Sequence, residues 1–222
     1  MGKINSIFIA KLEEILWLYA QPYDSKHPVV CFDERPCFLI GDTISPLPVK
    51  SGRTRKVHYA YEKLGSCALL ASIEPLTGVR KAILYHQRRK REYALFMKEL
   101  AALYPDAEKI HLIQDNLNTH DKSAFYEVFS TNEAFRLSQR FQFHFTPKSA
   151  SWLNMIEIEF SAIARQCLNR RIPTFEKLES ELLSLVQQRS KMQIKIDWQF
   201  SIDDARKTFA KWYGKINPTN KS

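Results

Sequence analysis

The segment Val29-Val30-Cys31-Phe32-Asp33-Glu34 is a short apolar run that ends in two acids. Pro28 precedes it, and a continuous apolar run bounded in this way is typical of a strand buried on both faces of a sheet. A second such run, residues 109–114, is followed by Asp115 and Asn116. We therefore expect two buried strands, each with an aspartate at its carboxyl end.

The rest of the chain alternates helical and strand patterns around these two segments. The spacing of apolar residues predicts helices over 4–19, 92–104, 151–171, 175–188 and 203–213, with one or two more within 122–140. Short apolar or alternating runs predict further strands over 57–61, 66–73, 81–86 and 141–146. Turns are expected at 64–65 and 77–78, and a loop over 41–55. This order indicates an α/β fold whose sheet is covered by helices.

Composition narrows the class of partner. The chain has 222 residues, and 33 Lys and Arg against 24 Asp and Glu give a net charge of +9, which favours a polyanionic partner such as nucleic acid. No run of apolar residues is long enough to span a membrane and no signal peptide is evident, so we expect a cytoplasmic protein without a membrane partner. The four cysteines form no CxxC pair, which indicates reduced thiols rather than a zinc site or disulfides.

A third acid lies in Ser-Trp-Leu-Asn-Met-Ile-Glu, residues 151–157, one turn into a predicted helix. Functional groups of open α/β sheets collect at the carboxyl ends of neighbouring strands, so Asp33 and Asp115 are expected to lie close together. Mg²⁺ prefers oxygen ligands and keeps part of its water shell, so a few carboxylates suffice to hold it. One aspartate after a strand is more often a turn or cap residue. Three acids in a basic chain favour a metal site for phosphoryl transfer.

Three segments resemble the catalytic domain of bacterial insertion-sequence 630 transposases, within the mariner superfamily. They are Asp-Asn-Leu-Asn-Thr-His (115–120), Ser-Trp-Leu-Asn-Met-Ile-Glu (151–157) and Arg-Gln-Cys-Leu-Asn-Arg-Arg (165–171). The resemblance covers nearly the whole chain. It implies a ribonuclease H-like fold, with a mixed five-stranded sheet flanked by helices and further helices at the C-terminus. It also implies a DDE triad of Asp33, Asp115 and Glu157 that is both catalytic and metal-binding, with two Mg²⁺ or Mn²⁺ ions.

The same resemblance divides the chain into a lead-in helix (1–25), a ribonuclease H-like DDE core (26–172) and a C-terminal helical extension (173–222). The implied activity is cleavage of DNA at the ends of a mobile element, followed by attack of the freed 3′-OH on target DNA at a TA dinucleotide. Double-stranded DNA from both sources is thus the expected partner, and the expected location is the cytoplasm, at the nucleoid.

Relatives of this family usually begin with helix-turn-helix modules that read the element ends, and we expect that region to be missing here. A separate helix-turn-helix partner from an upstream frame and a homodimer are the protein partners left open. Two other functions remain as alternatives. One is another ribonuclease H-like DNA nuclease, such as a junction resolvase, and the other is a DNA-binding transposase remnant that no longer cleaves.

Glu159 competes with Glu157 as the third acid. On a helical wheel the apolar stripe includes Leu153 and Ile156, with Glu157 at one edge of it and Glu159 beyond the other. In the family two residues separate a Leu-Asn pair from the acid, as Met155 and Ile156 separate Leu153-Asn154 from Glu157. We therefore select Glu157 and keep Glu159 as a neutral or phosphate-facing alternative.

Residues next to the acids are candidates for supporting roles. Glu34 neighbours Asp33, and the two-residue period of a strand turns it to the opposite face, so we expect a structural role. Asn116 and His120 match the family motif after the second acid, and either could orient water or phosphate. His120 capping a helix is an equal alternative.

Several basic side chains are candidates for contacts with the DNA backbone, which position DNA without reading its sequence. In a protein without a nucleic-acid partner, the run over residues 88–91 would be a solvated face. Lys148 and Ser149 precede the helix over 151–171, whose N-terminus favours phosphate, and Ser151 could cap that helix. The DNA-binding candidates are Arg53, Arg55, Lys56, Arg88, Arg89, Lys90, Arg91, Lys148, Ser149, Arg165, Arg170 and Arg171.

Overall fold

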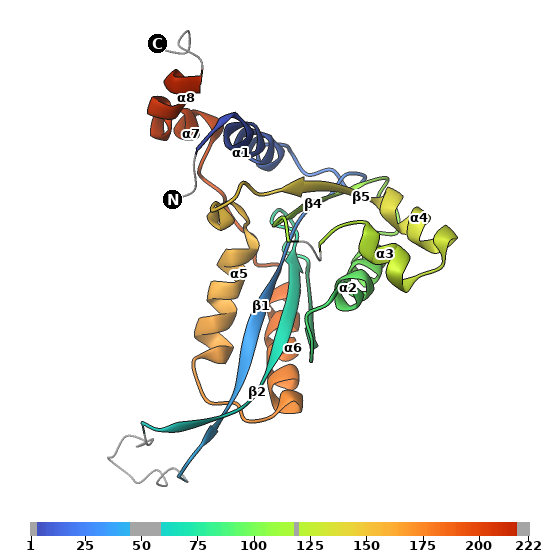
Figure 1. Cartoon of the computed structure of the whole chain (residues 1–222), viewed down its shortest axis with the longest axis vertical. Coiled ribbons are helices and arrows are strands. Elements are labelled where there is room, and N and C mark those ends of the chain that lie inside the picture. The colour runs from blue at the N-terminus through green and yellow to red at the C-terminus, as the bar shows by residue number, and fades with distance from the viewer. Residues whose placement is uncertain (1–3, 45–58, 118–119, 217–222) are drawn as a thin grey trace.

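The computed structural model describes residues 4–44, 59–117 and 120–216. Its strands form one mixed sheet in the order β3-β2-β1-β4-β5 (Figure 1). The bounds are β1 Val29–Asp42, β2 Tyr61–Ile73, β3 Arg80–Tyr85, β4 Ile110–Gln114 and β5 Phe141–Phe145. Strand β2 is antiparallel to both of its neighbours, β1 and β3, whereas β4 runs parallel to β1 and β5 runs parallel to β4. The mixed five-stranded sheet expected from the sequence is confirmed.

Helices cover both faces of this sheet (Figure 1). One face carries α2 Lys90–Ala102, α3 Ser123–Val128 and α4 Thr131–Arg140. The other carries α1 Ser6–Tyr19, α5 Ile156–Ile163 and α6 Phe175–Lys191, while α7 Ile202–Thr208 and α8 Ala210–Ile216 follow near α1. None of the described helices is long and apolar enough to cross a membrane.

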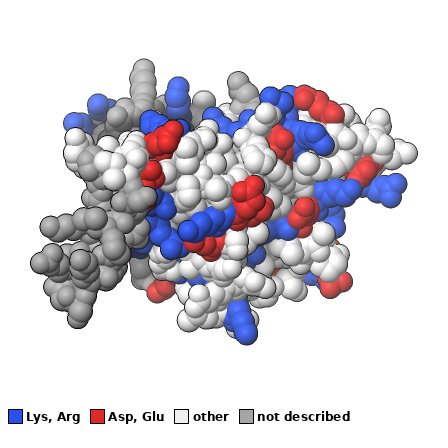
Figure 2. All heavy atoms as spheres, turned by 90° about the horizontal axis from the view of Figure 1, so that it is seen from below, with Lys and Arg blue, Asp and Glu red and all other residues white. Residues whose placement is uncertain are grey.

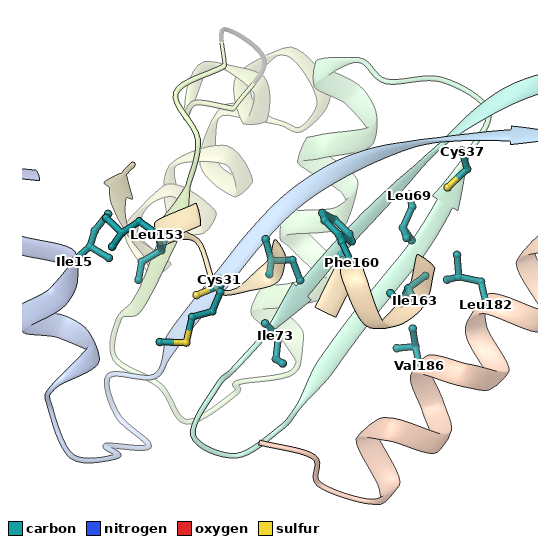
Figure 3. Packing of buried hydrophobic residues seen from close by; sticks show 14 of the residues in the cluster. Ile15, Cys31, Cys37, Leu69, Ile73, Leu153, Phe160, Ile163, Leu182 and Val186 are labelled. Carbon is teal, nitrogen blue, oxygen red and sulfur yellow. The ribbon is translucent and has the colours of Figure 1, made fainter. Parts of the chain in front are cut away.

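Alternation along the strands gives each face its own hydrophobic core. On β1, Val30 and Phe32 belong to the core under α2 to α4, and Cys31 belongs to the core under α5 and α6. In Figure 3, Phe160 and Ile163 of α5 and Leu182 and Val186 of α6 gather beside Leu69 and Ile73 of β2. Asp33 therefore faces α5, and Glu34 faces α2 and α3.

The N-terminal helix belongs to the same core as the sheet. Leu12, Ile15 and Leu16 of α1 are fully or almost fully buried in it. The Tyr19 hydroxyl donates a hydrogen bond to the carbonyl oxygen of Leu153 at 2.8 Å. This contact ties α1 to the segment that leads into α5.

Strand β1 is longer than expected, and this places Asp33 inside a strand rather than at its exit. Parallel pairing with β4 ends at Cys31, but antiparallel pairing with β2 continues from Cys31 to Asp42. The expectation that the strand stops at Phe32 is therefore wrong. The apolar run predicts only the part that is covered on both sides by neighbouring strands, whereas hydrogen bonds to β2 hold the polar remainder extended.

The prediction of a turn at residues 64–65 is also wrong, because β2 continues through these residues. The register between β1 and β2 shifts between Leu39 and Ile40, opposite Gly65, which has a φ of 155°. A glycine with positive φ suits a bulge as well as a turn, so the sequence does not separate the two. Of the strand expected over 57–61, residues 57 and 58 lie outside the described residues, and β2 begins at Tyr61.

The helix expected over 151–171 is broken into three pieces. A 3-10 turn covers Ser151–Leu153, α5 begins at Ile156, and a π-helical turn covers Ala164–Leu168. Ser151 consequently does not cap α5. The interruption falls at Asn154, whose backbone is extended and whose buried side chain bonds to β1.

A buried ion-pair cluster joins β3, α5 and α6. The Glu159 carboxylate accepts hydrogen bonds from Arg189 Nε at 2.8 Å and Nη2 at 3.0 Å, and lies 3.1 Å from Arg80 Nε. Arg80 donates further bonds to the carbonyl oxygens of Gly78 and Ile194. The Glu159 side chain is only 3% exposed. The neutral or phosphate-facing role considered for Glu159 is therefore wrong, and this carboxylate is a structural anchor.

Glu159→Gln should lower the free energy of unfolding by about 3–5 kcal/mol, because it leaves the buried Arg80 and the half-buried Arg189 without their counter-charge. Urea unfolding followed by tryptophan fluorescence measures this. Glu157→Gln, on the same helix, is the matched control and should not destabilise the fold. A Glu159→Gln variant within about 0.5 kcal/mol of the wild type would contradict the anchoring role.

Candidate active site

Two of the candidate acids are brought together by the register of β1 and β4. Cys31 pairs with Ile113 in the last parallel pair of these strands. Asp33 lies two residues beyond Cys31, and Asp115 lies two residues beyond Ile113. The two-residue period of the strand turns Asp33 to the face that carries α5, and Asp115 directly follows the end of the neighbouring β4.

The electrostatics of Asp33 show that both other acids lie within range of it. Its pKa is raised from an ordinary 3.8 to about 7, first by burial and then by the charges of Asp115 and Glu157. The hydrogen bond that its Oδ1 accepts from the Glu34 backbone at 2.7 Å, and the nearby His120, act in the opposite direction. Ionising the three carboxylates together is therefore unfavourable unless a cation joins them.

This donor set fits a hard divalent cation. Three carboxylates offer only oxygen, and no described cationic side chain forms an ion pair with Asp33 or Glu157. Within residues 4–44, 59–117 and 120–216, no three His, Cys, Asp or Glu side chains are packed closely enough to form a complete metal cage. The acids are thus within electrostatic range but do not form a closed ligand set.

Asn154 ties the third acid to the first. Its side-chain amide donates a hydrogen bond to the carbonyl oxygen of Phe32 at 2.8 Å, and its own carbonyl oxygen accepts from Glu157 N at 3.1 Å. Asn154 thus connects the residue before Asp33 to the first turn of α5. The sequence reasoning did not assign it a role, although it lies inside the motif over 151–157.

A family model described as DDE superfamily endonuclease matches residues 28–179, which is more than half of the chain and includes all three acids. This chain belongs to the DDE superfamily endonucleases. This membership confirms the expectation of a DDE catalytic domain. No curated protein shows a significant match to the sequence.

Solved structures show the same fold for this DDE endonuclease-family chain. A Mos1 mariner paired-end complex with Mn has a TM-score of 0.54 at 13% identity, covering 99% of this chain and 64% of that one. A Mos1 paired-end complex with Mg gives 0.54 at 13% identity, covering 100% and 68%. The Mos1 strand transfer complex gives 0.50 at 14% identity, covering 100% and 64%. The expected ribonuclease H-like fold is thereby confirmed, and the chain spans about two thirds of the Mos1 chain.

His120 lies beside the second acid of this DDE chain. Its Nδ1 is 2.7 Å from Asp115 Oδ1, and its Nε2 is 3.6 Å from Glu34 Oε2. Burial lowers the pKa of His120, but the two carboxylates outweigh it and raise the pKa to about 9. With both ring nitrogens facing carboxylates, the ring neither caps a helix nor offers a nitrogen to water. Asn116, the other supporting candidate, is exposed.

Some of the basic candidates already form ion pairs with acidic side chains of the protein, and others do not. Arg88 lies 3.1 Å from Glu34, and Lys90 contacts Glu127 at 2.5 Å. Arg89 and Arg91 are exposed. On the face drawn in Figure 2, Lys and Arg side chains are interspersed with Asp and Glu. The net charge of the chain therefore overstates the positive charge that this face presents to a phosphate backbone.

The remaining basic candidates lie in separate places. Lys148 and Ser149 are exposed in the segment after β5, separated from α5 by the 3-10 turn, so the helix N-terminus does not reinforce them. Arg165 is exposed in the π-helical turn. Arg170 pairs with Glu181, and Arg171 pairs with Asp42 at the far end of β1. Arg53, Arg55 and Lys56 lie outside the described residues.

Asn154→Asp should reduce DNA cleavage by about 100-fold, because a carboxylate cannot donate to the Phe32 carbonyl and α5 then shifts relative to Asp33. Single-turnover nicking of plasmid DNA in Mg²⁺ is the measurement, with thermal unfolding recorded alongside. Asn169→Asp, at an exposed asparagine beyond the same helix, is the matched control and should cleave normally. Normal cleavage by Asn154→Asp would show that this bond does not align the site.

Metal-free wild-type protein should lose stability relative to Asp33→Asn as the pH rises from about 4 to about 7. Over this window an unfolded Asp33 has released its proton, whereas the folded one, with its pKa raised to about 7, still holds it. The unfolded state binds fewer protons, so rising pH favours unfolding. Urea unfolding in EDTA across this range measures the difference. A difference that does not change with pH would contradict the raised pKa.

Proposed function

We propose that this chain is the catalytic domain of a DNA transposase, with Asp33, Asp115 and Glu157 as its metal-binding catalytic residues. The observation that carries the proposal is the convergence of these three carboxylates, from β1, the residue after β4, and α5, where burial and then the charges of Asp115 and Glu157 raise the pKa of Asp33. Carboxylates held this close together are costly to maintain in a fold unless they serve a bound cation, and no described cationic side chain pairs with Asp33 or Glu157.

The cations that fit are two Mg²⁺ or Mn²⁺ ions, in keeping with the Mos1 paired-end complexes reported with Mg and with Mn. When bound, such ions would supply Lewis-acid activation of an attacking oxygen and neutralise negative charge on the phosphate. The protein's own contribution is to hold the acids in place through the β1–β4 register and the Asn154 bond. In this proposal the acids act as ligands and need not accept protons.

The shape of the sheet suggests how DNA would lie. Arg171 is held at Asp42, nine residues beyond Asp33 along β1, which corresponds to about 30 Å of strand. That is about nine base pairs of duplex at ~3.4 Å each. Arg171 and its neighbour Arg170 would therefore contact the backbone away from the scissile phosphate. Lys148, Ser149 and Arg165 are exposed on the segments before and after α5 and are further candidates for backbone contacts.

The proposed substrates are double-stranded element ends and a target with a TA dinucleotide. The Mos1 structures reported as paired-end and strand transfer complexes support DNA of both kinds. The protein partners proposed alongside DNA are a separate helix-turn-helix chain, which would recognise the end sequence, and a second copy of this chain. The proposed location is the cytoplasm, at the nucleoid.

Asp33→Ala, Asp115→Ala and Glu157→Ala should each reduce cleavage and strand transfer by at least about 1,000-fold, because each removes a ligand for the charge-neutralising ions. DNA affinity should stay within about twofold of the wild type, because the phosphate contacts are elsewhere. Plasmid nicking, joining of a 3′-OH oligonucleotide to target DNA, and fluorescence anisotropy measure the three quantities. Asp106→Asn, an exposed acid before β4, is the matched control.

Two outcomes would overturn the proposal. Wild-type protein that binds DNA with a salt-dependent affinity but nicks nothing in Mg²⁺ or Mn²⁺ would be a binding remnant. Wild-type protein that cleaves branched DNA in strong preference to linear ends, and joins no 3′-OH, would be a resolvase-like nuclease.

A further inference from the structure

The described residues contain a buried relay on the face of β1 opposite Asp33. It runs from Asp115 to His120 at 2.7 Å, from His120 to Glu34 at 3.6 Å, and from Glu34 to Arg88 at 3.1 Å. The side chains of His120 and Glu34 are 1% and 4% exposed, whereas those of Asp115 and Arg88 are 32% and 55% exposed. The relay thus has two buried members between two that reach solvent.

The imidazole of His120 packs against two aromatic rings. The ring of Tyr93 stacks on it with the ring centres 4.9 Å apart, and Phe32 meets it edge-on at 5.3 Å. Its backbone carbonyl accepts a bond from Gln114 Nε2 at 2.7 Å, and Gln114 Oε1 accepts from the Tyr93 hydroxyl. With its ring packed and its backbone bonded in this way, the position of His120 is well defined.

The partners of His120 are immediate neighbours of the two aspartates. Phe32 and Glu34 flank Asp33 on β1. Gln114, the last residue of β4, directly precedes Asp115. The relay therefore spans the two central parallel strands and connects them at the level of the acids. It engages Asp115 through Oδ1, and His120 makes no bond to Oδ2.

We propose that Glu34 is a positioning residue that acts through His120 to fix the orientation of Asp115 toward bound metal. This rests on the function proposed above. The Glu34 carboxylate attracts His120 Nε2 and so holds the ring in the orientation in which Nδ1 meets Asp115. Arg88, in turn, gives the buried Glu34 a counter-charge at the surface. Glu34 then serves the site from the face of the sheet opposite to the metal.

Positioning of a metal ligand by a second carboxylate has a measurable consequence. Glu34→Gln keeps the size of the side chain but removes its charge, so the packed His120 ring loses the attraction that turns its Nδ1 toward Asp115. We expect the Kd for Mn²⁺, measured without DNA by electron paramagnetic resonance, to rise by about 10–100-fold, the usual effect of losing a partner of a metal ligand. Saturating Mn²⁺ should restore most of the cleavage. Glu62→Gln, an exposed acid on β2, is the matched control.

A mutant cycle separates action through His120 from other effects of Glu34. In the His120→Asn background, Glu34→Gln should cause no further rise in the Kd, because its route to Asp115 is already broken. Equal and additive effects in both backgrounds would overturn the proposal, and so would an unchanged Kd in the folded Glu34→Gln variant. A merely structural role would lower the melting temperature without moving the Kd.

If Glu34→Gln does not fold, Glu34→Asp decides the matter. This variant keeps the charge but withdraws the carboxylate from His120, so the Kd for Mn²⁺ should again rise. An unchanged Kd in the folded Glu34→Asp variant would overturn the relay. Failure of the proposed function looks different, because the wild-type protein would then neither bind Mn²⁺ nor cleave DNA.

Discussion

Parallel pairing of three residues at the centre of the sheet is the constraint on which the candidate site depends. Val29 to Cys31 of β1 run beside His111 to Ile113 of β4, and both partners are buried between two layers of helices. A slip of one residue in this short ladder would move one aspartate away from the other and turn it to the opposite face. Burial on both faces penalises such a slip, because it would expose apolar side chains and bury polar ones.

The acids on the two faces of β1 have different electrostatic surroundings. Asp33 faces α5, where its charge meets those of Asp115 and Glu157. Glu34 faces α2 and α3, where His120 and Arg88 balance it. Asp33 thus has no cationic partner among the described residues, whereas its neighbour Glu34 is balanced by two. This difference between neighbouring residues follows from the two-residue period of the strand.

The segments at the two ends of the chain support the same arrangement. Tyr19 of α1 holds the backbone of Leu153, directly before the asparagine that aligns α5 with β1. Near the C-terminal end of the chain, Arg189 of α6 forms a hydrogen-bonded ion pair with Glu159 in the middle of α5. Helix α5 is therefore fixed at both its start and its centre by residues far away in the sequence, which leaves Glu157 between two anchored points.

The sequence by itself determined the order of strands and helices, the mixed sheet that the family resemblance implied, and Asp33, Asp115 and Glu157 as the candidate acids. These are local properties, since apolar periodicity and short motifs are contained within a few neighbouring residues. Only the tertiary structure decided that Asp33 lies inside β1, that Glu159 is bound by arginines, and that Glu34 reaches His120. Each of these depends on a partner from another element, and a side chain's partner across a fold leaves no trace in its own local pattern.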